Sequence, residues 1–77
     1  MTTDEDIRKR MDGLSKRLDG AEIRTFEEDW NMGAQVYGIL ADIVIMSSKE
    51  KMGLRDDWEK NIKLKYVSAI RRYSTAA

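Results

Sequence analysis

The amino-acid sequence predicts an all-α protein, a small three-helix domain, and three observations predict it. No proline occurs in the 77 residues, so no helix has to be broken for that reason. Only Ala21–Thr25 alternates as a half-buried strand does, and we interpret it as an extended connector. Three runs with helical spacing of apolar residues each follow a capping signal. The length allows a single helical domain, 1–77.

The first helix is expected over residues 4–19. Thr2 or Thr3 can cap it, because a Thr followed three residues later by an acidic side chain satisfies free amides at a helix start. Gly20 suits the C-terminal cap. The apolar residues form a narrow seam of the coiled-coil kind: Ile7, Met11, Leu14 and Leu18.

The second helix is expected over residues 26–52, with Thr25 as its cap and Gly53 as its stop. It is apolar on almost every side. One face has large residues: Met32, Val36, Ile39, Ile43 and Met46. Another face has mostly small ones: Ala34, Gly38, Ala41 and Ile45. A helix of this kind must be covered on more than one side, which places it at the centre of the fold.

The third helix is expected over residues 57–73, with Asp56 as its cap. Its apolar face has spacings of four, four, three and four residues: Trp58, Ile62, Tyr66, Ala69 and Tyr73. Together, the first and third helices offer too little apolar surface to enclose the second. We therefore expect dimerisation or a partner chain to complete the core.

The expected binding surface combines the seam of the first helix with parts of the second. Its candidate residues are Ile7, Met11, Leu14, Leu18, Met32, Ala34, Gly38, Ala41 and Ile45. Asp42 interrupts the apolar run of the second helix. It lies either on a solvent-exposed strip or against a basic group of a partner.

The chain lacks the residues that several kinds of site require. The chain has no cysteine and no histidine, which excludes disulfides, thiolate or imidazole metal ligands and triads with an imidazole base. The densest acidic groups, at 27–29 and 56–57, lie at expected helix starts, where acidic residues are favoured for electrostatic reasons alone. We therefore expect no catalytic site, cofactor or metal. A small enzyme that uses carboxylates is the weakest of the hypotheses.

The basic residues are concentrated near the C-terminus. Residues 1–31 contain nine acids and six bases, whereas residues 58–77 contain one acid and five bases. A basic helix can lie against a nucleic-acid backbone. The candidate patch is Lys60, Lys63, Lys65, Arg71 and Arg72. The zero net charge gives little long-range attraction to nucleic acid, so this is the alternative hypothesis.

The leading hypothesis is a non-catalytic helical module that binds another protein, itself, or both: a small accessory, adaptor or inhibitor protein, with a homodimer expected. The longest apolar stretch, 32–46, is too short for a bilayer span, and the acidic start lacks the features of a secretory signal. We expect a soluble, cytoplasmic protein with no membrane span.

Overall fold

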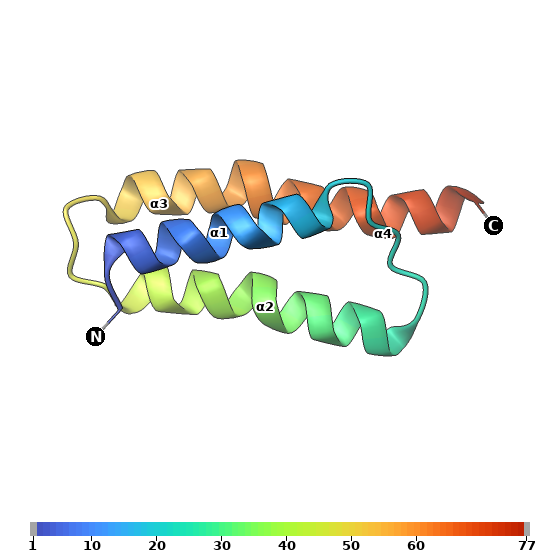
Figure 1. Ribbon diagram of the computed structural model, residues 1–77, viewed down its shortest axis with the longest axis horizontal. Coiled ribbons are helices and arrows are strands. Elements are labelled where there is room, and N and C mark those ends of the chain that lie inside the picture. The colour runs from blue at the N-terminus through green and yellow to red at the C-terminus, as the bar shows by residue number, and fades with distance from the viewer. Residues whose placement is uncertain (1, 77) are drawn as a thin grey trace.

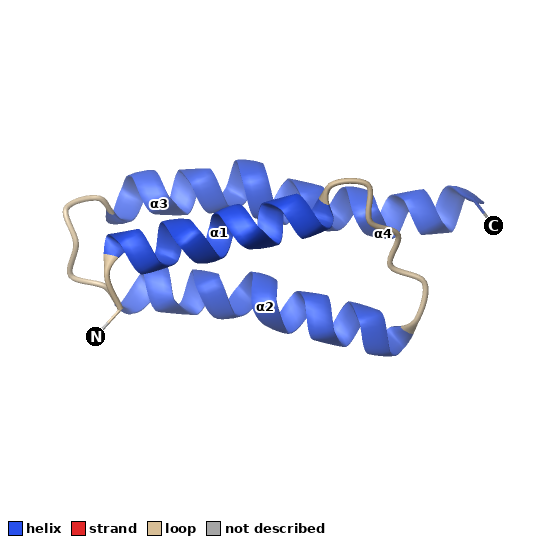
Figure 2. Cartoon of the chain, in the orientation of Figure 1, coloured by secondary structure: helices blue, strands red, loops and turns tan. Residues whose placement is uncertain are grey.

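Three helical rods lie side by side in an up-down-up arrangement (Figure 1). The computed structural model describes the backbone of residues 2–76 and the side chains of residues 2–71. The helices are α1 (Asp4–Leu18), α2 (Phe26–Ile45), α3 (Lys51–Trp58), η1 (Glu59–Lys63) and α4 (Leu64–Ala76). The last three form one continuous rod, and the described part of the chain contains no strand (Figure 2). The all-α expectation is confirmed.

Threonine caps start the first two helices. At α1 the Thr3 hydroxyl accepts from the Asp6 amide, and the Asp6 carboxylate accepts from the Thr3 amide, both at 3.2 Å. These two hydrogen bonds make a full capping box, in which Thr3 rather than Thr2 is the cap. Hydrogen bonding from the Thr3 backbone amide, and then from the Thr3 hydroxyl, also holds the pKa of the Asp6 carboxyl below its ordinary value, since both groups favour the ionised form. At α2 the Thr25 hydroxyl accepts from the Glu28 amide at 3.1 Å, as expected.

The connector between α1 and α2 is extended, as the sequence predicts. It begins at Gly20, whose φ of 74° lies in the left-handed region that glycine adopts without strain. The Ala21 amide donates to the Leu18 carbonyl, which ends α1. Ile23 is buried and anchors the connector against the bundle.

The boundary between the second and third rods differs from the expectation. The second helix ends at Ile45 rather than 52, and the third rod begins at Lys51 rather than 57, so neither the Gly53 stop nor the Asp56 cap is correct. The reason is local hydrogen bonding. The Ser48 hydroxyl accepts from the Glu50 amide and donates to Asp4, and serine side chains that bond locally favour turns over helix. The Lys51 ammonium group then donates to the Val44 carbonyl at the end of α2.

A wide turn, η1, interrupts the third rod. The Leu64 amide donates to the Glu59 carbonyl, a bond across five residues instead of four. Leu54, Trp58 and Ile62 are all buried, although they are four residues apart. In an α-helix each step of four overshoots a full turn by about 40°, so these side chains would rotate out of the core. Because η1 spans Glu59–Lys63, the wide turn offsets this rotation on the step from Trp58 to Ile62 and keeps Ile62 facing the core.

The hydrophobic core lies along the axis between the three rods. Side chains of α1, α2 and the third rod contribute about equally: Ile7, Met11, Leu14, Leu18, Val36, Ile39, Ile43, Leu54, Trp58 and Ile62. The Trp58 indole N–H donates to the Val36 carbonyl at 2.8 Å, which satisfies the one polar group that this ring buries.

Candidate functional site

The most unusual surface of the molecule is the side of α2 that no other element covers. Large apolar side chains are exposed there along the full length of the helix. Their exposed fractions are 80% for Phe26, 66% for Trp30, 49% for Tyr37, 54% for Val44 and 79% for Ile45. Ala34 and Ala41 are exposed between them. We call these seven residues the outward face of α2.

The helical period explains why this face is uncovered. Val36, Ile39 and Ile43 turn one side of α2 into the core. At 100° per residue, Ala34 and Ala41 lie opposite that side, and the aromatic residues lie between the two. Only two rods pack against α2, and beyond its core side they reach it at Tyr37 and Asp42. The outward face therefore lacks the apolar neighbours that such side chains have in a closed bundle.

An aromatic cluster borders one edge of the outward face. The rings of Tyr37 and Trp58 lie 5.8 Å apart, and those of Tyr37 and Tyr66 lie 6.4 Å apart at nearly right angles. Such tilted contacts are favourable for aromatic rings. Tyr37 therefore belongs to both the rim of the core and the surface, and its position is set by the third rod.

Tyr66 is held in place by α2. Its hydroxyl donates to the Asp29 carboxylate. Burial, together with this carboxylate, raises the pKa of Tyr66 to about 12. A Cβ atom at Gly33 would lie 2.9 Å from the Tyr66 oxygen, which is closer than a real contact allows. Gly33 therefore leaves the room on α2 that the end of the Tyr66 side chain occupies.

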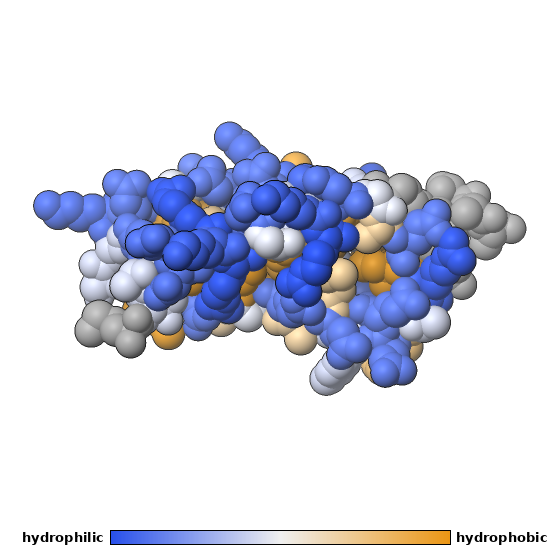
Figure 3. All heavy atoms as spheres, viewed as in Figure 1, coloured by the Kyte–Doolittle hydropathy of each residue, from blue (hydrophilic) through white to orange (hydrophobic). Residues whose placement is uncertain are grey.

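Ion pairs and hydrogen bonds with α1 border the other edge. Arg10 pairs with Asp42, and Arg17 donates to the Gln35 side chain at 2.6 Å. Asp42 is half-buried rather than on a fully exposed strip, and the basic group beside it is Arg10 of the same chain. The polar strip expected on α2 faces the arginines of α1. The α1 side of the molecule is correspondingly hydrophilic at its surface (Figure 3).

The structure buries part of the candidate interface predicted from sequence and leaves the rest exposed. The seam of α1 is not available to a partner, because α2 and the third rod already cover Ile7, Met11, Leu14 and Leu18. Met32 and Gly38 are half-buried. Ala34, Ala41 and Ile45 are exposed on the outward face. The small-residue face of the second helix is thus the part that remains open.

Sequence reasoning missed the larger residues of the outward face. Phe26, Trp30, Tyr37 and Val44 belong to neither of the two faces predicted for the second helix, although they contribute most of the apolar surface exposed on the outward face. Their spacings of four, seven and seven residues return to one side of a helix. That spacing was the available signal, but it does not say which side the other helices cover.

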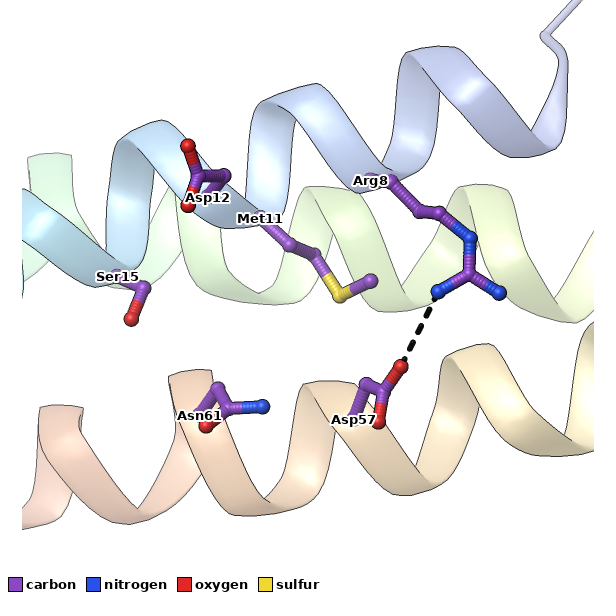
Figure 4. Close-up of a pocket in the computed structure, with 6 residues that line it drawn as sticks. All are labelled: Arg8, Met11, Asp12, Ser15, Asp57 and Asn61. Atoms are coloured by element: carbon purple, nitrogen blue, oxygen red, sulfur yellow. Dashed lines mark hydrogen bonds and ion pairs between the residues drawn. The ribbon is translucent and has the colours of Figure 1, made fainter.

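A cavity of about 390 Å³ lies between α1 and the third rod (Figure 4). Its lining is Arg8, Met11, Asp12, Ser15, Asp57 and Asn61. Arg8 and Asp57 face each other across it at 3.3 Å, and Asp12 pairs with Lys16 on its own helix. The Arg8–Asp57 pair therefore links the two rods, and the lining has no arrangement of nucleophile and base.

The candidate basic patch is only partly assembled. Lys65 is turned toward α1, where it pairs with Asp19 at 2.6 Å and donates to Ser15 at 2.7 Å. Lys60 is exposed and Lys63 is half-buried. Arg71 is exposed, and the side chain of Arg72 lies outside the described residues. One of the five basic groups therefore serves the packing of α1 against α4.

Among the described residues, no group of acidic side chains is arranged to hold a metal ion. No helix in this part of the chain is both long enough and apolar enough to cross a bilayer.

Comparison of the chain with protein-family models, with curated proteins and with solved structures finds no match. The outward face of α2 is thus the feature on which a functional argument can rest.

Proposed function

We propose that this protein is a non-catalytic interaction module that acts by binding another protein chain through the outward face of α2. The supporting observation is a row of five large apolar side chains, each about half exposed or more, on one side of a well-packed helix. Exposed apolar surface that runs continuously along an element is typical of association sites.

The composition of the face supports the same proposal. Trp, Tyr and Phe are enriched at protein interfaces, and Trp and Tyr are among the residues that contribute most to binding energy there; Trp30, Tyr37 and Phe26 supply one of each. Between Trp30 and Ile45, the exposed residues of the outward face carry no charge. A charged partner surface would have to be desolvated against this face without compensation, so the partner surface is itself apolar.

The scaffold beneath the face is rigid enough for recognition. Three buried residues of α2 and the Trp58 hydrogen bond to Val36 hold the helix against the other rods. A preorganised helix loses little conformational entropy on binding, which favours affinity. This role is that of a small accessory, adaptor or inhibitor protein.

The test is capture of binding proteins by the immobilised chain and by two variants. Ala41→Glu places a charge in the middle of the outward face. Met52→Glu places the same charge at another exposed apolar residue, on α3. We expect proteins that bind the wild type and Met52→Glu but not Ala41→Glu. If both variants retain the same proteins, the proposal is wrong; it is also wrong if the wild type binds neither another protein nor a second copy of itself.

A further inference from the structure

We propose that the outward face of α2 binds a second copy of this chain, with the two α2 helices packed antiparallel around a two-fold axis. This inference rests on the proposed function, because it takes the outward face to be a protein-binding surface and specifies its occupant. Three properties of the face favour a second copy: its area, the order of large and small residues along it, and its charge.

The exposed area is that of a small dimer interface. Aromatic side chains carry about 150–250 Å² each, so at their exposed fractions Phe26, Trp30 and Tyr37 offer roughly 290–490 Å². Val44 and Ile45 bring the face to roughly 500 Å². Two copies packed on each other therefore bury on the order of 1,000 Å², the lower limit for a specific interface.

The order of side-chain sizes along α2 fits an antiparallel pair. Large aromatic residues lie at its beginning and small or aliphatic ones toward its end. Antiparallel pairing can place Trp30 opposite Ala41 and Tyr37 opposite Ala34, so each large ring meets a small residue of the other copy. Parallel pairing places each residue opposite itself, so that Trp30 meets Trp30 and Ala34 meets Ala34. Alternation of large and small residues is what close packing requires.

The charges favour the same orientation. The helix contains four acidic residues and no basic one, and three of the acids fill its first turn. A parallel pair would place the three acids of one copy beside the same three acids of the other copy. In the antiparallel pair Glu27 lies opposite Val44 of the second copy, where the Lys51 ammonium group bonds to the Val44 carbonyl. Glu27 thus meets a positive charge at the C-terminal end of the facing helix, twice per dimer.

The oligomeric state is measured first, by sedimentation equilibrium over a range of concentrations, for the wild type, Ala41→Glu and Met52→Glu. We expect the wild type and Met52→Glu to form a dimer. Ala41→Glu, which buries a carboxylate against Trp30 of the other copy, is expected to weaken the association at least tenfold. A wild type that stays monomeric, or a dimer that Ala41→Glu leaves unchanged, overturns the inference.

The orientation is measured with a spin label. The chain has no cysteine, so Glu27→Cys gives one labelling site per copy. In the antiparallel dimer the two labels are 17 residues apart along the helix axis, which at 1.5 Å per residue is about 26 Å. In a parallel dimer they are separated by the interhelix distance of about 8–10 Å. A distance in the shorter range overturns the antiparallel arrangement.

The outcomes separate this inference from the proposed function. A monomeric chain that still captures proteins through the outward face contradicts the second copy and leaves the interaction module supported. A dimer that is insensitive to Ala41→Glu, together with no capture, contradicts both.

Discussion

Replacing Gly33 with alanine tests the packing of α2 against α4. An alanine in the interior of a helix is more favourable than glycine by about 1 kcal/mol. At Gly33, however, the new methyl group meets the Tyr66 hydroxyl at 2.9 Å, and overpacking of this kind costs about 1–3 kcal/mol. The Tyr66 ring cannot move away freely, because Asp29 accepts a hydrogen bond from its hydroxyl. We expect a net destabilisation of about 1 kcal/mol.

Gly13 provides the matched control. It lies inside α1, and a Cβ atom there meets nothing within 4 Å. Gly13→Ala should therefore stabilise the protein by about 0.5–1 kcal/mol. In a domain of this size 1 kcal/mol shifts the melting temperature by about 4–8 °C, so the two variants should melt on opposite sides of the wild type. Thermal and urea unfolding followed by circular dichroism measure both.

The same substitution in a Tyr66→Phe background shows whether the clash with the Tyr66 oxygen causes the destabilisation. In Tyr66→Phe the clashing oxygen is absent, and the next nearest ring atom is 3.6 Å from the Cβ position, an ordinary contact. Gly33→Ala should then stabilise the protein by about as much as Gly13→Ala does. The reasoning is refuted if Gly33→Ala and Gly13→Ala have the same effect in the wild-type background.

The remaining predictions concern the third rod, the pH dependence and a helix cap. Leu54→Ala should cost about 2–5 kcal/mol because Leu54 is fully buried, whereas Met52→Ala, at an exposed site, should stay within about 0.5 kcal/mol; equal effects would contradict the packing of Leu54 in the core. The pKa of Tyr66 is raised to about 12, so its stabilising contribution is complete below pH 10 and is lost as the pH rises from 10 toward 12. The difference in unfolding free energy between wild type and Tyr66→Phe should shrink over that range, and a constant difference would be inconsistent with the Asp29 contact. Thr25→Ala should destabilise by about 1 kcal/mol through loss of the α2 cap; no change in urea unfolding would count against the cap.

The sequence was sufficient to predict the helical class and the first two helix starts, because caps and apolar spacing are local signals. The break after α2 was not predictable in the same way. Residues 46–50 contain neither proline nor glycine. The turn depends on the Ser48 contact with Asp4, the first residue of α1, which is distant in sequence. Gly53 misled the prediction because a glycine can also lie inside a helix, as it does in α3.

The spacing of apolar residues could indicate one part of the candidate site, the small-residue face of the second helix. The periodicity of the second helix separates a face with Ala34 and Ala41 from the core side, and that face is the one left open. The seam of the first helix was assigned to a partner because its narrow width suggested a coiled coil. The wide turn η1 brings Trp58 and Ile62 into line against it, and no local pattern announces that turn.

The most direct test of the binding role of α2 is the nitrogen–proton NMR spectrum of the two tryptophan indole groups, recorded as the protein concentration rises. Trp30 lies on the outward face, and Trp58 is buried with its indole N–H bonded to Val36. We predict that the Trp30 signal shifts as a second chain covers it while the Trp58 signal stays in place. A Trp30 signal that does not change as the molecular mass doubles, or that stays unchanged at every concentration, would contradict the pairing of two copies through the outward face.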